Sequence, residues 1–496
     1  MKIIIFLLSL FLFLLFFLRH EALLISQYYS KKRYLMTLFQ EDKKRMTKSF
    51  YLFFFPLLFF LLFFLKIEYV TILFLCAWLI DYLFSPSFMP LKKTRRSLTL
   101  FFFSFILWGT IIYFSSYILR LIFASMLPFM ASFCLLISST LLQPYEKEIQ
   151  KYYIKKAKRK MKNNPHLITI AITGSYGKSS FKYFLYQFLK MKYQVIMTPK
   201  SINTPMGITK FINENLDEHT EIMILEFGVD EKKGMDRLLS IVVPDIGVLT
   251  AIGKMHMKTF HLLENIYLEK RKLLFKAKKG YFSMDSSYLK AKEKDLTTME
   301  GYSYQDIFSY VNRHENGLEV EYMKERMIIP LYGMFQLSNI SGAIQVATDL
   351  GVSKKEIRQI LPSLEGVEHR FKKRKEGHMT IFDDAYNGNE EGILEAIQTV
   401  MLQKGKKAII TPGVIELGKD YEKVNQNIGR HLIHFDRVYI VSKENKHPLY
   451  DGYMENNGEK ERIEFVSCFL EGYQKCKEEK IDVLLIANDT FSTFLK

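Results

Sequence analysis

The first 143 residues contain long runs of phenylalanine, leucine and isoleucine, and these runs constrain the fold more than any other feature of the chain. An apolar run of about 20 residues crosses a bilayer as a helix, because a helix satisfies its own backbone hydrogen bonds. The runs are 3–18, 50–65, 69–84 and 99–142, and the last is long enough for two spans that break near Arg120. The sequence therefore predicts about five transmembrane helices, of which one or two are short enough to be re-entrant or interfacial.

Positive charge is concentrated in the same part of the chain. Residues 1–165 hold 23 Lys and Arg against 7 Asp and Glu, whereas residues 166–496 hold 46 against 45. The net charge of +17 therefore gives no support to a nucleic-acid-binding domain. The segments 19–49, 85–98 and 143–165 carry 8, 4 and 8 basic residues. By the positive-inside rule, this distribution predicts a multi-pass plasma-membrane protein with its N-terminus outside and its C-terminal domains in the cytoplasm.

The first apolar run has a second interpretation, as a cleaved signal peptide. Arg19, His20 and Glu21 follow it directly, where a signal peptide would have small residues at a cleavage site. We therefore interpret the run as a retained anchor.

A basic segment at 144–165 follows the apolar region. Its residues favour a helix, and Asn163-Asn164-Pro165 is a sequence at which a helix is expected to end. The helix is either an ordinary solvated linker or a helix that lies along the anionic inner surface of the membrane, and the sequence favours neither.

After Pro165, short apolar runs alternate with amphipathic segments, which is typical of an α/β fold with a parallel sheet. The run 167–172 leads into TGSYGKSS at 173–180 and then into a predicted helix. A strand, a glycine-rich loop and a helix that begins with Lys-Ser bind phosphate through backbone N–H groups, although Ile172 stands where the general P-loop has glycine. In such a site, Lys178 neutralises the β- and γ-phosphates and Ser179 offers its hydroxyl to Mg²⁺.

Two later runs of the predicted sheet end in polar residues. Glu226 follows the run 222–225, and His256 comes shortly after the run 246–252. Ligands of open parallel sheets bind at the carboxyl ends of the strands, so we expect both side chains near a phosphate-bound metal. Each residue by itself is equally well explained as a turn carboxylate or a core histidine.

Eight motifs between residues 166 and 450 resemble those of the Mur ligases in order and spacing. They are TGSYGKSS, LEFG, VLTAIGKMH, EKRKLLF, GMFQLSNISGA, HRF, DDAYNGN and VIELG. The resemblance is greatest to the members that add D-alanyl-D-alanine to a muramoyl peptide. It implies a P-loop Mur-ligase central domain at 166–365 and a Rossmann-like C-terminal domain at 366–496. The transmembrane region, 1–143, stands in place of the family's UDP-binding N-terminal domain.

The resemblance also implies site residues. The residues that would bind ATP are Gly174, Ser175, Gly177, Lys178, Ser179, Ser180, Gln336, Asn339, Arg370, Asp383 and Asp384. The ligands of two Mg²⁺ ions would be Ser179, Glu226, His256 and Lys270, the last as a carbamate that offers the anionic oxygen an ammonium lacks. The catalytic residues would be Lys178, His256, Lys270 and Arg370. The substrate-facing loops would contribute Asn203, Thr204, Asn387 and Asn389.

Several positions depart from the family pattern. Ala251 stands where asparagine is common before the metal histidine, Phe335 and Gln336 replace a His-Asn pair near adenine, and Gly413 replaces an aspartate. Gln336 keeps both a donor and an acceptor, so recognition of adenine would survive the change.

The implied activity is an ATP-dependent peptide ligase that forms an acyl phosphate on a carboxylate and then an amide. The carboxylate would be a muramoyl-peptide precursor, either nucleotide-linked or lipid-linked, and the amine would be D-Ala-D-Ala or another donor. A poly-γ-glutamate-type ligase is one alternative, because it also joins such an ATPase to a membrane. A non-catalytic nucleotide-binding scaffold is the other, and Ala251 and Gly413 are consistent with it. The DDAYNGN segment favours the first interpretation.

Overall fold

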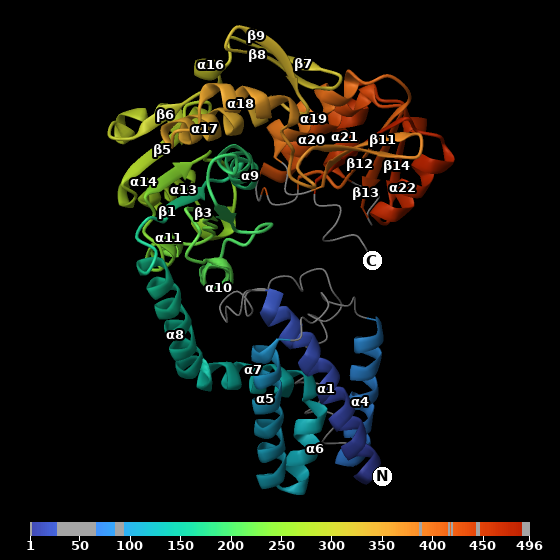
Figure 1. Cartoon of the computed structure of the whole chain (residues 1–496). Coiled ribbons are helices and arrows are strands. Elements are labelled where there is room, and N and C mark those ends of the chain that lie inside the picture. Colours follow the sequence, from blue (N-terminus) through green and yellow to red (C-terminus); the bar gives the residue numbers. More distant parts are fainter. Residues whose placement is uncertain are drawn as a thin grey trace. The chain divides into compact units, whose positions relative to one another are not determined.

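The computed structural model describes residues 2–26, 66–84, 94–385, 389–414, 417, 420–442 and 447–488. These residues belong to two compact units, Met1–Lys151 and Tyr152–Lys496, whose elements are labelled in Figure 1. The predicted span at 50–65 and the predicted site residue Asn387 lie outside the described residues.

The N-terminal unit is helical. Its helices are α1 (Lys2–Ser26), α4 (Ile67–Phe84), α5 (Arg95–Phe114), α6 (Tyr117–Ser125), α7 (Leu127–Leu141) and the beginning of α8 (Gln143–Lys162). Helix α1 packs on α4 and α7, and α5 packs on α7. Aromatic rings fill the core: Phe13 stacks on Trp108 with 4.5 Å between the centroids, and Trp78 donates to Ser125 O at 2.8 Å.

Two helices of the described residues are long and apolar enough to cross a membrane, at Ile5–Ala22 and Arg96–Phe114. The pair Tyr117–Ser125 and Phe129–Leu141, bent by 95°, makes a third candidate if it counts as one span, and Ile67–Leu79 is apolar but shorter. The break expected near Arg120 lies slightly earlier, at residues 115–116, where Ser116 caps α6 by accepting from Leu119 N.

The central domain is built on a six-stranded sheet in which every pairing is parallel, in the order β2-β3-β1-β4-β5-β6. The strands are β1 (Ile168–Thr173), β2 (Val195–Met197), β3 (Ile222–Glu226), β4 (Ile246–Leu249), β5 (Lys279–Ser283) and β6 (Glu300–Tyr302). Alternate side chains of β1 and β3 enter two different cores, which explains why these strands read as continuous apolar runs. The prediction of a parallel α/β sheet is confirmed.

Helices cover both faces of this sheet. The core on one face includes α9 (Lys178–Leu189) and α17 (Phe335–Asp349), and α18 (Lys354–Ile360) joins it. The core on the other face includes α10 (Pro205–Asn215), α11 (Gly234–Leu239), α13 (Leu263–Lys270) and α14 (Lys272–Lys276). The short helices are α12 (Met257–Phe260), α15 (Ser287–Ala291) and α16 (Tyr304–Ile307). An antiparallel sheet of β7 (Tyr310–His314), β8 (Gly317–Tyr322) and β9 (Glu325–Ile329) completes the domain.

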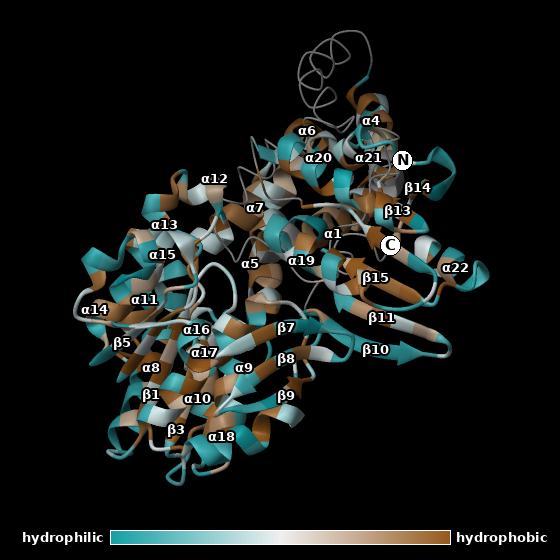
Figure 2. Cartoon of the chain, turned by 90° about the horizontal axis from the view of Figure 1, so that it is seen from above, coloured by the Kyte–Doolittle hydropathy of each residue, from teal (hydrophilic) through white to brown (hydrophobic). Residues whose placement is uncertain are grey.

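The C-terminal domain has a second six-stranded sheet, in the order β10-β11-β15-β12-β13-β14. Its strands are β10 (Lys372–Glu376), β11 (Met379–Asp384), β12 (Lys407–Thr411), β13 (Arg437–Val441), β14 (Ile463–Val466) and β15 (Val483–Ala487). Only β10 is antiparallel to its neighbour. Figure 2 shows β10 as hydrophilic and β15 as hydrophobic, as expected of an edge strand and a central strand.

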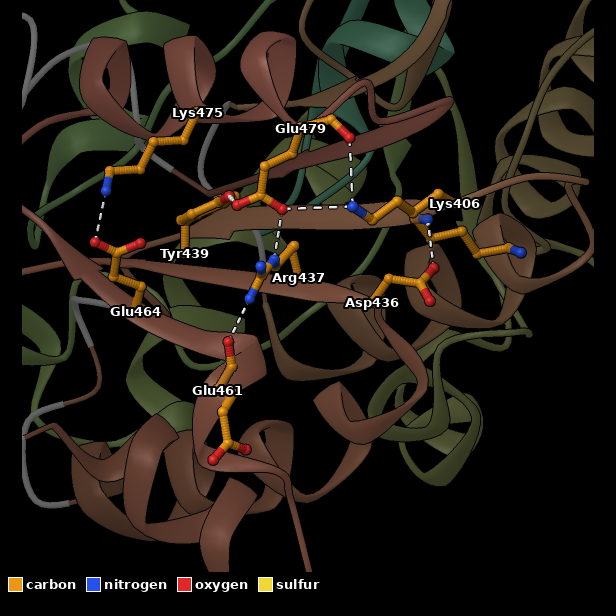
Figure 3. A network of polar contacts seen from close by, with 9 residues as sticks. Lys406, Asp436, Arg437, Tyr439, Glu461, Glu464, Lys475 and Glu479 are labelled. Carbon is orange, nitrogen blue, oxygen red and sulfur yellow. Dashed lines mark hydrogen bonds and ion pairs between the residues drawn. The ribbon is translucent and has the colours of Figure 1, made fainter.

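Helices also cover both faces of this second sheet. One core includes α19 (Glu390–Met401), α20 (Tyr421–His431) and α21 (Pro448–Glu455), and the other includes α22 (Phe469–Glu478). A polar network holds the end of α22 to the sheet, as Figure 3 shows. In this network, Glu479 accepts from Arg437 Nε at 2.5 Å, from the Tyr439 hydroxyl at 3.0 Å and from Lys406 Nζ at 3.5 Å.

Candidate nucleotide and cation site

The glycine-rich loop lies between β1 and α9, and its two glycines are sterically required. Gly174 has φ +154° and Gly177 has φ +80°. A Cβ at Gly174 would lie 2.1 Å from Thr250 Oγ1, and one at Gly177 would lie 2.4 Å from Asn339 Oδ1. The loop is therefore packed against the end of β4 and against α17, which brings the predicted residue Asn339 beside it.

Two serines of the loop region are already part of the local structure. Ser175 N donates to Ala251 O at 2.7 Å, and the Ser175 hydroxyl donates to Gly253 O and accepts from Gly253 N. Ser180 is buried in the first turn of α9. Ser175 thus joins the glycine-rich loop to the segment after β4.

Glu226 is the centre of the polar cluster at this edge of the sheet. The side chain lies at the end of β3, is 1% exposed, and accepts from Ser179 Oγ at 2.8 Å, Lys182 Nζ at 3.2 Å and Asn203 Nδ2 at 3.2 Å. Burial by itself raises the pKa of this carboxyl, but Lys182, Lys178 and the hydrogen bonds outweigh it and leave the pKa of Glu226 below its ordinary value. The ionised carboxylate and the Ser179 hydroxyl form an oxygen donor set of the kind that Mg²⁺ prefers.

Lys182 also belongs to this cluster, although its sequence context did not indicate a role in the site. It lies one helical turn after Lys178, is 3% exposed, and donates to Lys200 O at 2.6 Å as well as to Glu226. The four-residue spacing from Lys178, which puts both on one helix face, was the available signal. It was not sufficient, because lysine in an amphipathic helix is usually on the solvated side.

Lys178 and Lys270 meet at one backbone carbonyl. Their ammonium groups donate to Gly174 O at 2.8 and 2.7 Å, and Lys178 also donates to Ser175 O. Burial lowers the pKa of Lys178 to about 8. Lys270, which is 2% exposed, has its pKa lowered well below the ordinary value by burial and by the charge of Lys178.

The surroundings of Lys270 differ from those of its neighbours in the sequence. Arg271 lies over the ring of Tyr267, and Lys272 pairs with Asp236 and Glu269. Lys270 alone of the three is enclosed beside the glycine-rich loop, so it is not an ordinary exposed helix lysine.

His256 precedes α12, at the same edge of the sheet as Glu226. Its backbone is left-handed with φ +53°, and its carbonyl accepts from Thr259 Oγ1, which also donates to Asp230 O. Across the described ranges of the chain, no group of three or more His, Cys, Asp and Glu side chains is arranged to hold a metal.

Gln336 and Asn339 lie in the first turns of α17. Asn339 Nδ2 donates to Phe335 O at 3.4 Å, whereas Gln336 is 1% exposed and its Oε1 has no hydrogen-bond partner among the described residues. An unpaired buried acceptor is costly unless a ligand supplies a donor, and the exocyclic amine of adenine is such a donor.

The C-terminal domain contributes Arg370 and two aspartates at the end of β11. Burial and the neighbouring Asp383 raise the pKa of Asp384 to about 7, although Arg370 opposes the shift. Arg370 also lowers the pKa of Lys178, so the charge of Arg370 acts both at the glycine-rich loop and at the end of β11. His369 Nδ1 lies 2.8 Å from Asp383 Oδ2, a contact that the sequence did not indicate.

The predicted substrate-facing residues make local contacts. Thr204 caps α10 by accepting from Gly207 N at 3.2 Å, and Asn389 caps α19 by accepting from Gly392 N at 2.7 Å. Asn389 also forms a hydrogen bond with Tyr176 of the glycine-rich loop. Asn203 donates to Glu226 rather than facing open space.

Comparison with known proteins places this site in a family. Residues 172–347, from the end of β1 through most of α17, match the model of the Mur ligase middle domain. This central part of the chain therefore resembles the middle domain of the Mur ligases. All the predicted site residues except Arg370, Asp383, Asp384, Asn387 and Asn389 lie within this middle domain.

Two curated proteins that are similar to this chain carry the same name. The UDP-N-acetylmuramoyl-tripeptide–D-alanyl-D-alanine ligase of Borreliella burgdorferi is 29% identical over 297 residues, which are 55% of this chain and 62% of that protein. The enzyme of the same name from Bacillus subtilis is 27% identical over 290 residues, with the same shares of 55% and 62%. The chain thus spans less than two thirds of the length of these relatives.

Two solved structures share the fold of a large part of this chain. The D-alanyl-D-alanyl ligase of Acinetobacter baumannii aligns with TM-score 0.60 and 17% identity over 70% of this chain and 78% of that one. The MurF ligase of Thermotoga maritima in complex with ADP aligns with TM-score 0.57 and 23% identity over 69% and 80%.

Proposed function

We propose that this chain is a membrane-anchored, ATP-dependent peptide ligase of the Mur ligase family that adds D-alanyl-D-alanine to a muramoyl-peptide precursor of peptidoglycan. One observation carries the proposal: Ser179, Glu226, Lys178 and Lys270 converge on the glycine loop between β1 and α9. The names of the curated relatives supply the substrate class.

The residues present fit ATP and Mg²⁺. The glycine loop leaves no room for a Cβ, the buried Gln336 Oε1 lacks a donor, and Glu226 with Ser179 offers hard oxygen ligands. Mg²⁺, when bound there, would neutralise charge on the β- and γ-phosphates. Asp383 and Asp384, at the end of β11, are the carboxylates available to a ribose.

Lys178 and Arg370 would balance the remaining phosphate charge. Lys178, with its pKa of about 8, is mostly protonated at neutral pH, and in the absence of nucleotide its ammonium satisfies the carbonyls of Gly174 and Ser175. The γ-phosphate is a stronger acceptor than these carbonyls, so the ammonium is expected to move to it. Arg370 would complete the site from the C-terminal domain.

The surroundings of Lys270 favour a carbamate. Reaction with CO₂ needs the neutral amine, and the lowered pKa of Lys270 supplies it. The Lys270 nitrogen forms a bond to the carbon of CO₂ and loses one proton. The neutral amine thereby becomes an anionic carbamate, which attracts the neighbouring Lys178 ammonium. The product offers oxygen atoms to a second Mg²⁺, and His256 would be the other ligand.

With ATP bound, the acceptor carboxylate would attack the γ-phosphorus, the bond from that phosphorus to the β,γ-bridging oxygen would break, and an acyl phosphate and ADP would form. The neutral amine of D-Ala-D-Ala would then attack the carbonyl carbon, and collapse of the tetrahedral intermediate would release phosphate and one proton and leave the amide. Charge neutralisation by Lys178 and Arg370 serves both steps, because each develops negative charge on oxygen.

The apolar N-terminal unit supports a membrane anchor. Besides the two helices of sufficient length, α5 leaves Phe102, Ile106 and Phe114 exposed by 59, 62 and 82%. Side chains of this kind are stable against lipid and costly against water. Such an anchor would bring the ligase to a lipid-linked acceptor, although a UDP-linked acceptor is compatible with the same chemistry.

The test is phosphate release by the purified chain in detergent, with ATP, Mg²⁺, D-Ala-D-Ala and either UDP-linked or lipid-linked muramoyl tripeptide. We expect phosphate and a pentapeptide product by mass spectrometry, and loss of both in Lys178→Ala. Lys190→Ala, an exposed lysine at the end of the same helix, is the matched control. A folded parent that makes no product from either acceptor would overturn the proposed substrate, and full activity of Lys178→Ala would overturn the nucleotide site.

A further inference from the structure

Helix α8 carries an apolar stripe that the core does not use. On one face, Ala157 is fully buried in the core of the central domain, and Ile154 and Met161 pack against it. Tyr145, Ile149 and Tyr152 are exposed by 64, 39 and 66%. At 100° per residue, these three lie on the opposite face of the helix from the buried set.

A basic stripe occupies a third face of the helix, between the buried set and the aromatic stripe. Its members are spaced by four, four, three and four residues and all are exposed: Lys147, Lys151, Lys155, Lys158 and Lys162. Among the described residues, only Lys151 of this stripe has an acidic partner, Glu148 at 2.6 Å. Four ammonium groups on one line of the helix therefore lack a counter-charge in the described part of the chain.

The first turn of α8 is held at the basic end of α5. Arg96, in the first turn of α5, forms a bidentate ion pair with Glu146 at 2.6 and 2.5 Å. The positive-inside rule places this end of α5 at the cytoplasmic membrane surface. Helix α8 also begins two residues after the apolar helix α7 ends at Leu141.

We propose that α8 binds the surface of an anionic lipid bilayer, with Tyr145, Ile149 and Tyr152 inserted at the headgroup boundary and the lysine stripe over the lipid phosphates. The proposal rests on the membrane anchoring proposed above. Tyrosine suits this depth, because its ring is apolar and its hydroxyl reaches water. A surface recess of about 440 Å³, lined by Tyr145, Lys147 and Lys151, lies at the corner between α7 and α8 and is large enough for a headgroup.

Charge complementarity favours an anionic bilayer over water as the surroundings of the exposed face of α8. A solvated linker helix needs lysines but has no use for an exposed stripe of two tyrosines and an isoleucine. A neutral surface would accept that stripe but would leave the lysines without a partner. An anionic bilayer satisfies both stripes at once.

The test uses the full chain in nanodiscs of phosphatidylcholine, with or without phosphatidylglycerol, after replacement of the four native cysteines. An environment-sensitive fluorophore is attached at Ile149→Cys or Tyr152→Cys, and at Lys190→Cys as a solvent control. In anionic discs we expect a blue shift and a several-fold drop in quenching by iodide at 149 and 152, with no change at 190. Replacement of the five stripe lysines by glutamine should abolish that difference between the two kinds of disc.

Extraction with alkaline carbonate separates this proposal from the anchor. If the chain remains in the membrane pellet but positions 149 and 152 are quenched as strongly as 190 in both discs, the α8 proposal is wrong and the anchor stands. If the chain is extracted, the anchor itself is wrong. Equal protection in neutral and anionic discs would show that the lysine stripe does not select the lipid.

Discussion

Replacement of Lys182 by methionine should destabilise the central domain strongly. The change keeps an unbranched side chain that is one atom shorter, but it leaves Glu226, which is 1% exposed, with Ser179 and Asn203 as its side-chain hydrogen-bond partners and without its ion-pair partner. Removal of one member of a buried ion pair costs about 3–5 kcal/mol. For a domain of this size, a loss of about 4 kcal/mol lowers Tm by roughly 8–16 °C.

Calorimetry of the full chain is the suitable assay, because both tryptophans, Trp78 and Trp108, lie in the N-terminal unit and fluorescence would not report the central domain. Lys182→Met combined with Glu226→Gln should recover most of the loss, since no buried charge is left without a partner. Lys190→Met, at an exposed position at the end of the same helix, should cost less than about 0.5 kcal/mol.

The effect of pH follows from the lowered pKa of Glu226. The stability that this ionised carboxylate contributes is present above its ordinary pKa of 4.5 and is lost as the pH falls through the lower folded-state value. The loss of stability in Lys182→Met, measured relative to the parent, should therefore be largest at neutral pH and smaller in acid. If Lys182→Met melts within a few degrees of Lys190→Met, and the double variant shows no recovery, the buried pair is not what holds Glu226 in place.

Three further predictions concern the same site. Lys270→Arg should abolish product formation, because guanidinium stays protonated and cannot form a carbamate. The activity of the control Arg271→Lys should stay within a few-fold of the parent. Similar activity of the two variants would contradict the carbamate. Gly177→Ala should lose binding of an ATP analogue, because position 177 has φ +80° and the added Cβ would lie 2.4 Å from Asn339 Oδ1. An unchanged Kd for the analogue would disprove this packing. The pKa of Asp384 is raised from 3.8 to about 7, so its contribution to stability is complete below pH 3.8 and falls by roughly 4 kcal/mol as the pH rises through 7. Asp384→Asn should accordingly gain stability relative to the parent between pH 5 and 8, and a pH-independent difference would refute the raised pKa.

Sequence alone was sufficient for the features that arise within one element or between neighbours along the chain. The strand, glycine loop and Lys-Ser helix at 167–190 are consecutive, so their order predicts the loop geometry directly. The parallel sheet followed from the alternation of apolar runs and amphipathic segments. Local caps were also readable in principle: Thr204 precedes a proline at the first position of a helix, and Asn389 precedes two glutamates.

Only the tertiary structure decided which charges are buried and what they contact. Lys182 and Glu226 are 44 residues apart, and Lys270 is 96 residues from the carbonyl it shares with Lys178. In the sequence, Lys270 looks like its neighbours Arg271 and Lys272, because composition and helical spacing do not reveal which face another segment will cover. The lowered pKa of Lys270 results from burial and from a second ammonium at the same oxygen, and both are consequences of how β1, β3 and α13 pack together.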